Sequence, residues 1–442
     1  MRVGVERISS GDLVQLATDV GPVPMNVGAV LLLDPSAGIT VGDLEVAVCT
    51  RLAGVGRLRQ RLVTVRPGLG RPYWLDDGTF DIHTHVSQAT SPDAAGLDAL
   101  LSVAVDEVTT PLPRDRPLWR ALLVSAPTGR PVGIVVTLHH VVADGIGGLA
   151  VLGRLVDEAV QSPDHSAPPA GPAPAAAPRS RDLLADRAAE LGRSAIALPG
   201  AVARAWLGHG ELGRPGQLAP RSSLNATTGP RRQAQTVDVE LAPLRAAGRA
   251  RNATINDMLL VAVGTAMATT LHRRGESVRN LVVSVPITAR ASTTSADLGN
   301  QVGVMPVRVP VTGTLDARLA RVSEVTRAQK SHARGASAVL VGPAFRLLAR
   351  VGVFRWFVDR QRLVNSFLTN LPGPHQQLSL AGAPILAIVP ITVTAGNVGV
   401  AFAALSYAGR LRVTVITDPD VVPETDELAA ALKAELTAIA AS

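Results

Sequence analysis

Two adjacent histidines stand where an apolar run of residues meets a turn that contains glycine. The segment reads Leu138-His139-His140-Val141-Val142-Ala143-Asp144-Gly145, and the apolar run before it begins at Val132. The ordinary pKa of histidine lies near neutrality, so this side chain can take a proton from a hydroxyl group and later return it to a leaving group. Functional residues gather in loops that follow strands, so the pattern predicts general acid–base chemistry here.

The two histidines are expected to do different work. Neighbouring residues on a strand point to opposite faces, so only one of His139 and His140 can face a cleft. Asp144 is placed to bind an arginine or backbone N–H groups and so fix the loop, while Gly145 permits a tight backbone. The plainer alternative is two polar residues at a strand end, each satisfied by its neighbours. A metal site is disfavoured, because two adjacent strand histidines cannot both bind one ion.

Other metal chemistry is also not expected. His83 and His85 lie two residues apart on an expected strand and share a face, where they are predicted to flank a surface or a cleft rim rather than bind zinc. Cys49 is the single cysteine, which argues against a disulfide framework and any cysteine-based metal cluster and indicates a reducing compartment.

Length and composition predict a large folded protein. The chain has 442 residues, of which 47% are apolar and 18% charged, enough for two or three domains or two lobes that share a site. Its net charge of +7 suits an anionic cofactor or a membrane surface. Aromatic residues make up 3%, too few for base-stacking platforms, so nucleic acid is not an expected partner. The first residues mix acids and bases without an apolar run, which predicts no export and a cytoplasmic location.

The elements that must position these residues follow from apolar periodicity and turn signals. Strands are expected at 27–33, 80–86, 119–125, 132–138, 236–241, 280–288, 303–311, 398–407 and 411–417, and helices at 41–52, 97–108, 147–160, 255–270, 315–332, 339–361 and from 424 onward. Trp119 is expected in the core. The pattern predicts a mixed α/β protein of two lobes, each a sheet with helices.

A proline- and alanine-rich stretch divides the chain. Residues 163–180 are expected to be a linker between an N-terminal lobe, 1–162, and an amphipathic helical connector, 181–222, which leads to a C-terminal lobe, 223–442. The basic amphipathic helix of the connector, 181–207, is expected either to pack on the protein or to touch lipid.

An uncharged segment, residues 376–409, has the length of a membrane span. Pro384 and Pro390 interrupt it, and Gly396-Asn397 is a turn signal, so it is expected to form buried β-hairpins instead.

Several short motifs accompany the histidine segment in a fixed order. They are Pro24-Met25-Asn26-Val27-Gly28, Pro113-Arg-Asp-Arg-Pro-Leu-Trp119, Leu224-Asn225, Gly229-Pro230, Thr254-Ile-Asn-Asp257, Val285-Pro286-Ile-Thr-Ala-Arg290, Leu298-Gly299-Asn300 and Thr369-Asn370-Leu371-Pro372-Gly373-Pro374. With these motifs the chain resembles the CoA-dependent acyltransferase superfamily and, within it, the bacterial wax ester synthase/diacylglycerol acyltransferase family. The resemblance spans nearly the whole chain.

The resemblance implies a fold and a reaction. The fold would be a two-lobed, chloramphenicol acetyltransferase-like α/β sandwich with an active-site tunnel between the lobes. The reaction would move a fatty acyl group from acyl-CoA, as co-substrate, to diacylglycerol or a long-chain alcohol, giving triacylglycerol or wax ester. No metal and no permanently bound cofactor are expected, and the protein could sit on a membrane or lipid-droplet surface.

The resemblance also assigns roles. His140 would be the general base, and His139 and Asp144 would hold the loop. Arg290, from the Pro286-x-x-x-Arg290 pattern, would pair with Asp144. The family commonly has histidine where this chain has Asn26.

Further polar residues have open roles. Asn256 is a candidate polar group near the site, whereas Asp257 is expected to form a capping box with Thr254. Asn300 and Asn370 either line the cleft or make turns. Candidates for the CoA phosphates, with no choice among them, are Arg114, Arg116, Arg231 and Arg232.

Three rival functions remain open. The first is an acyltransferase for a hydroxyl or amine of a specialised metabolite. The second is a non-catalytic homologue that binds a lipid surface. The third is a condensation module that acts on carrier-bound acyl groups, for which attached carrier or adenylation segments would be expected.

Overall fold

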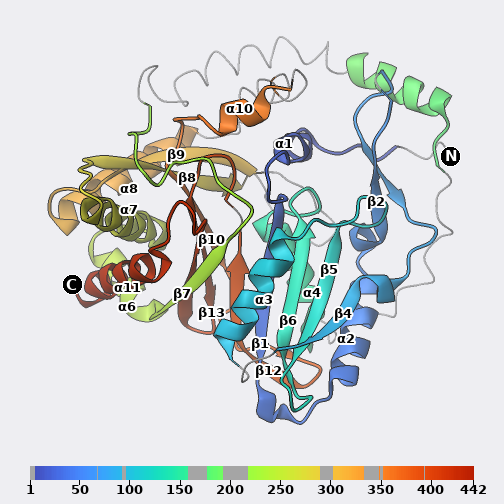
Figure 1. Cartoon of the computed structure of the whole chain (residues 1–442), viewed down its shortest axis with the longest axis horizontal. Coiled ribbons are helices and arrows are strands. Elements are labelled where there is room, and N and C mark those ends of the chain that lie inside the picture. The colour runs from blue at the N-terminus through green and yellow to red at the C-terminus, as the bar shows by residue number, and fades with distance from the viewer. Residues whose placement is uncertain are drawn as a thin grey trace.

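A computed structural model describes residues 5–66, 68–91, 96–157, 177–192, 218–288, 302–332, 348, 352–392 and 394–442. Its helices and strands form two lobes, each built on a six-stranded sheet with helices packed against it (Figure 1). The expected mixed α/β, two-lobed architecture is confirmed. Most of the expected linker, along with Arg290 and Asn300, lies outside the described residues.

The first sheet carries the histidine segment. Its strand order is β11-β12-β1-β6-β5-β4, with β1 at Asn26–Leu33, β4 at Val86–Thr90, β5 at Trp119–Ser125, β6 at Pro131–His139, β11 at Ser379–Leu380 and β12 at Ala383–Ile391. Every residue of β6 is buried, because helices cover both faces of the sheet. Helices α2 (Val41–Ala53) and α4 (Gly145–Leu155) pack on one face, and α3 (Leu97–Thr109) packs on the other.

Strand β12 joins the first sheet although it follows the second half of the chain. It pairs antiparallel with β1, with Val389 opposite Val30. Two strands of the expected C-terminal lobe, 223–442, therefore belong to the first sheet. The expected strands within 376–409 are present, but Gly396-Asn397 does not close a hairpin. It lies on the crossover from β12 to the second sheet, whose β13 spans Val400–Tyr407.

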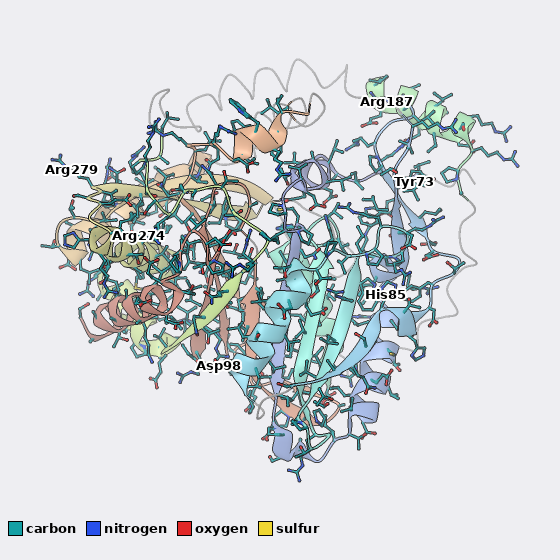
Figure 2. The ribbon with its side chains drawn as sticks, in the orientation of Figure 1. Tyr73, His85, Asp98, Arg187, Arg274 and Arg279 are labelled. Atoms are coloured by element: carbon teal, nitrogen blue, oxygen red, sulfur yellow. The ribbon has the colours of Figure 1, made fainter. Side chains whose placement is uncertain are left out.

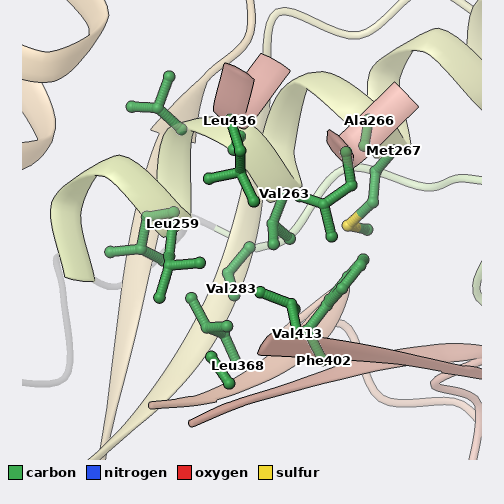
Figure 3. Close-up of a cluster of buried hydrophobic side chains, with 14 of the residues drawn as sticks. Leu259, Val263, Ala266, Met267, Val283, Leu368, Phe402, Val413 and Leu436 are labelled. Atoms are coloured by element: carbon green, nitrogen blue, oxygen red, sulfur yellow. The ribbon is translucent and has the colours of Figure 1, made fainter. Parts of the chain in front are cut away.

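The second sheet has the strand order β7-β14-β13-β10-β8-β9. The other strands are β7 (Gln233–Glu240), β8 (Asn280–Thr288), β9 (Val302–Pro310), β10 (Ser366–Pro372) and β14 (Arg410–Thr417), and the helices are α6 (Leu241–Ala250), α7 (Ile255–Arg273), α8 (Leu315–His332) and α11 (Thr425–Ala441). Helix α7 is apolar on nearly every side, and its Leu259 and Val263 are buried with Phe402 of the sheet in one core (Figure 3). Each such fully buried side chain stabilises the fold by about 1.5–3 kcal/mol.

The prediction of a strand at 80–86 is wrong for all but its last residue. Residues Ile82–Thr84 form a short 3-10 helix, η3, and strand β4 begins only at Val86. The cause is Asp81, whose carboxylate accepts a hydrogen bond from the backbone N–H of His83 at 3.0 Å and so starts a turn. His83 and His85 consequently do not share a strand face: His83 is exposed, and His85 is buried.

The core contains the expected Trp119, which is 2% exposed. The ring of His85 stacks on Trp119 with centroids 4.7 Å apart, and its Nδ1 lies 2.9 Å from the Trp119 carbonyl oxygen. Burial lowers the pKa of His85, which favours the neutral ring in this stack.

The connector helix packs on the first lobe. Residues 180–192 are helical, and Leu183 is buried against Tyr73 of a two-stranded ribbon, β2 (Gln60–Val63) with β3 (Tyr73–Asp76). Asp186 binds Arg7 with an N–O distance of 2.8 Å. This part of the expected helix packs on the protein through Leu183, and the rest of it, 193–207, lies outside the described residues. The remaining short elements are α1 (Ser10–Thr18), α10 (Phe354–Val358), η1 (Pro35–Ala37) and η2 (Gly56–Arg59).

The long helix expected at 339–361 is described only in its last part. There, Gly352 has a φ of 75°, and α10 begins two residues later, so the described end of the segment is a short separate helix. Within the described residues, no single helix has the length and apolarity of a membrane span. Only α6 and α7 together reach it, and these meet at a bend of 100°.

Candidate active site

His140 lies in the turn directly after β6, and the backbone of the neighbouring strand fixes its place. Its N–H donates to the carbonyl oxygen of Met25 at 2.8 Å, and Val142 N–H donates to the carbonyl of His139 at 2.8 Å. Residue 139 is the last of the strand, opposite Asn26 of β1. The turn is therefore set by strand pairing, as expected for a functional loop on a rigid sheet.

His139 is held by two hydrogen bonds that use both ring nitrogens. Its Nδ1 accepts from the backbone N–H of Val141 at 3.1 Å, and its Nε2 lies 3.2 Å from the Oδ2 of Asp19. This hydrogen-bond pattern assigns a neutral ring that carries its proton on Nε2. With its Nδ1 lone pair occupied, His139 cannot act as a base without losing the turn. The described geometry fits the loop-holding role expected for it.

Asp19 is a site residue that the sequence did not reveal. It also pairs with the guanidinium of Arg114, and its Oδ1 accepts from Met25 N–H at 3.0 Å. Burial alone would raise the pKa of Asp19, yet the hydrogen bonds from His139 and from Met25 N–H, with the positive charge of Arg114, lower it below its ordinary value. Asp19 thus stays ionised and clamps the segment before β1 to the end of β6. No local motif marks it, since its partner follows 120 residues later.

His140 is half-buried as a residue, whereas His139 is 2% exposed. Surrounding protein lowers the pKa of His140, because burial disfavours the imidazolium form more than the nearby carboxylate of Asp144 favours it. Near neutral pH the ring is therefore unprotonated, which is the state that a general base needs.

Asp144 caps helix α4, as expected of a residue that binds backbone donors. It is buried, and its Oδ1 accepts a hydrogen bond from Gly147 N–H at 2.8 Å. A side-chain cap of this kind typically stabilises a helix by about 1 kcal/mol. Its expected partner Arg290 lies outside the described residues.

Gly145 brings the histidine loop against the second lobe. A Cβ atom built at this position would lie 2.9 Å from the Cδ2 of Leu371, on strand β10 of the second sheet. Only glycine permits this approach without displacing the leucine. Asn370, the neighbour of Leu371 on β10, is half-buried at the same junction. The structure therefore brings the loop and β10 together.

Asp257 has the predicted capping role and a second one. It forms the reciprocal capping box with Thr254 at the start of α7. Its carboxylate also accepts from the hydroxyls of Ser323 at 3.1 Å and Thr326 at 2.7 Å, both on α8. It is buried, and the described hydrogen bonds all join elements of the second lobe. Asn256, beside it, is half-buried.

The arginines considered for CoA phosphates are largely paired within the chain. Arg232 has a side chain that is 1% exposed and lies 3.4 Å from the carboxylate of Asp418, so it is not available to a ligand. Arg231 pairs with Asp420 at the surface. Arg114 binds Asp19, as described above. Arg116 pairs with its neighbour Asp115 at 3.2 Å, and its side chain is 41% exposed.

Asn26 is fully buried beside His139. The family that the sequence resembles commonly has a histidine at this position. The Nδ2 of Asn26 donates to the carbonyl oxygens of Val108 at 3.1 Å and Thr110 at 3.0 Å. The residue thereby ties β1 to the end of α3. This is a structural role that does not involve the ring of His140.

Comparison with known proteins gives two family matches that together cover most of the chain. Residues 8–259 match the wax ester synthase/diacylglycerol acyltransferase catalytic domain, and residues 298–440 match the WS/DGAT C-terminal domain. A Mycobacterium tuberculosis H37Rv protein named probable diacylglycerol O-acyltransferase tgs1 is 29% identical over 418 residues, covering 92% of this chain and 89% of that protein.

Solved structures share the fold. The wax ester synthase/diacylglycerol acyltransferase from Marinobacter aquaeolei VT8 aligns with a TM-score of 0.68 and 21% identity, covering 99% of this chain and all (100%) of that chain. The first condensation domain of the calcium-dependent antibiotic synthetase, in complex with a substrate analogue, aligns with a TM-score of 0.67 and 19% identity over 100% and 97% of the two chains. At these identities the likeness concerns the fold.

Proposed function

The chain belongs to the wax ester synthase/diacylglycerol acyltransferase family, and from that premise we propose the roles of its site residues. It is an acyl-CoA-dependent O-acyltransferase that acts on diacylglycerol or long-chain alcohols. The observation that supports His140 as its base is the position of this half-buried residue, with a lowered ring pKa, in a loop that contacts the second lobe.

In the proposed reaction, His140 accepts the proton of the acceptor hydroxyl as its oxygen attacks the thioester carbonyl carbon. A C–O bond forms, and the carbonyl oxygen takes up the electron pair. When this tetrahedral intermediate collapses, the C–S bond breaks, and the thiolate of CoA receives the proton from the imidazolium. The thiolate is a good leaving group, so a covalent acyl-enzyme is not required. One base supplies about 10²- to 10⁴-fold of rate, and alignment of two substrates supplies much of the rest.

The remaining roles in the proposal concern the loop and the cleft. His139 and Asp144 hold the turn, and Arg290 pairs with Asp144. Asn300 and Asn370, with Asn256, are candidate polar groups of a tunnel between the lobes, which would admit acyl-CoA and the acceptor from separate sides.

We also propose that the protein acts in the cytoplasm at a membrane or lipid-droplet surface, where its acceptors reside. Leu184 and Leu191 lie two helical turns apart on the helix 180–192 and are 52% and 53% exposed. Trp356 of α10 is 62% exposed. Both helices lie along the upper edge of Figure 1, and Arg187 extends from the first of them (Figure 2). Exposed apolar side chains beside arginine suit an interfacial surface.

Liposome flotation tests this surface. Binding to anionic vesicles should fall when Leu184 and Leu191 are both changed to serine or when Trp356 is changed to alanine. Val46 on α2, which is 67% exposed, supplies a matched control in Val46→Ser, which should still float. Flotation that is equal in all of these proteins would contradict the proposed surface.

The acyltransferase activity itself is tested by release of free CoA thiol from a long-chain acyl-CoA. Diacylglycerol, hexadecanol, a polar metabolite alcohol and an amine serve as parallel acceptors. Release that depends on diacylglycerol or hexadecanol supports the proposal. Release only with the polar alcohol or the amine would favour a specialised-metabolite acyltransferase, and no release with any acceptor would favour the non-catalytic alternative.

A further inference from the structure

Three metal-binding side chains converge on the first lobe, on elements separate from the histidine loop. A carboxylate oxygen of Glu45, the Sγ of Cys49 and a ring nitrogen of His83 all lie within 4.8 Å of one another. Glu45 and Cys49 are one turn apart on α2 and therefore share a face of that helix. His83 comes from η3, and its Nδ1 lies 3.9 Å from the Oε1 of Glu45.

We propose that Glu45, Cys49 and His83 form a binding site for one zinc ion, with water as the fourth ligand. Sulfur, imidazole nitrogen and carboxylate oxygen are the donors that zinc prefers. With metal–ligand bonds of about 2.0–2.3 Å, the donors of a tetrahedral site are about 3.3–3.8 Å apart. The three donors already lie within 4.8 Å of one another, so an approach of at most about 1.5 Å between any two of them would bring them to that spacing. His83 is exposed, so a metal ion can enter from solvent.

Neighbouring groups already orient two of the ligands. The amide of Gln88 donates to the Oε2 of Glu45 at 2.7 Å, which leaves Oε1 as the oxygen nearest His83. Asp81 accepts the backbone N–H of His83 at 3.0 Å and so fixes the turn from which the imidazole projects. Hydrogen bonds of this kind to ligands are the usual outer support of metal sites.

The electrostatics of the cluster suit a cation. In the part of the chain that the structure describes, no arginine or lysine forms an ion pair with Glu45 or Asp81. A divalent ion would supply the missing positive charge and stabilise the thiolate. The sequence expectation that one cysteine rules out a cysteine-based site does not hold for a mixed donor set, which needs only one thiolate.

Zinc bound at this site would link two elements of the first lobe and stabilise the fold. Zinc would join η3 to α2 beside the stacked rings of His85 and Trp119, where Figure 2 places His85 near the outer side of the first lobe. Because a ligand that binds only the folded state stabilises it, zinc should raise the midpoint of thermal unfolding.

The test uses the purified full chain, freed of metal by a chelator, and titrates it with zinc against a fluorescent indicator and with cobalt(II) by absorbance. One metal ion per chain and a thiolate-to-cobalt charge-transfer band are expected. Cys49→Ser should abolish the band, and His83→Ala should weaken zinc binding at least about tenfold, because loss even of a partner that only supports a ligand costs about 10- to 100-fold. His272→Ala, at another exposed histidine, should leave both unchanged.

Two results would overturn the proposal. One is the absence of bound zinc or cobalt at the end of the titration. The other is metal binding that persists undiminished in both Cys49→Ser and His83→Ala. His83 is exposed, so its alanine variant should fold normally, and circular dichroism of the metal-free protein checks this. Glu45→Gln, which keeps the size of the side chain, should likewise weaken zinc binding.

Discussion

The Nε2 of His139 lies 3.2 Å from the carboxylate of Asp19, and this bond joins the end of β6 to the segment that follows α1. The opposite ring nitrogen accepts the N–H of Val141, so the imidazole connects Asp19 to the turn on which His140 stands. Asp19 is thus a positioning residue that acts on the proposed base through His139.

Asp19→Asn should lower kcat by about 10- to 100-fold and leave KM nearly unchanged, the effect of losing one hydrogen bond to a charged group worth about 1.5–3 kcal/mol. Steady-state acyl transfer measures both constants. Asp115→Asn is the control, because Asp115 is exposed and pairs only with its neighbour among the described contacts. A kcat equal to that of the native enzyme would show that Asp19 does not position the base.

His140→Gln should reduce kcat by about 10²- to 10⁴-fold, the usual contribution of a placed general base. Glutamine has a side chain of similar reach that cannot accept the proton at neutral pH. The measurement is release of CoA thiol, and thermal unfolding checks that the fold persists. His272→Gln should have native activity. If His140→Gln retained full transfer activity, another group would have to be the base.

The pH dependence of kcat/KM should show an acid limb below pH 6.5. Burial lowers the pKa of His140 from its ordinary value of 6.5, so the neutral ring persists to lower pH and activity falls only as pH drops through this lowered pKa. The unfolded chain binds this proton more readily, so the stability contributed by the group is present above pH 6.5 and decreases on acidification. Rates measured between about pH 5 and 8 test this. A half-maximal rate above pH 7 would contradict the shift.

Gly145→Val should reduce activity and cost about 1–3 kcal/mol of stability, because the new side chain would enter the space of Leu371. Leu371→Ala in the same chain should restore part of both, which a double-mutant cycle would register as coupling. Gly153→Val on the same helix is the control, since a Cβ there would meet nothing within 4 Å. Failure of Leu371→Ala to improve Gly145→Val would disprove the contact.

Asp418→Asn should destabilise the protein by about 3–5 kcal/mol, because it leaves the buried guanidinium of Arg232 without its counter-charge. Asp420→Asn offers the matched comparison: its partner Arg231 is exposed, so solvent screens the pair and the expected loss of stability is small. Urea unfolding followed by circular dichroism measures both. Equal midpoints for the two variants would mean that the buried pair contributes no more than the surface pair.

Local patterns predicted much of the fold. Strands β5 and β8 have the bounds expected from their apolar runs and flanking turns. Other elements depend on information outside their own segment. The segment at η3 was predicted as a strand because its apolar residues alternate with polar ones. The N-cap hydrogen bond of Asp81 starts a 3-10 turn there instead. The pairing of β12 with β1 could not be foreseen, since apolar content does not identify a distant partner strand.

The site divides in the same way. Both histidines and Asp144 belong to one continuous sequence segment, so their residue types were enough to predict a chemical role for this loop. Asp19 gave no such signal, because only the pairing of β1 with β6 brings it to His139. The contact of Gly145 with Leu371 depends on how the lobes meet and has no local signature.

Strands β11 and β12 come from the second half of the polypeptide but belong to the first sheet, so this sheet needs both halves of the chain to form. Without residues 379–391, β1 would become an open edge able to pair with strands of other molecules. The first sheet can therefore be completed only after residues 379–391 have been synthesised.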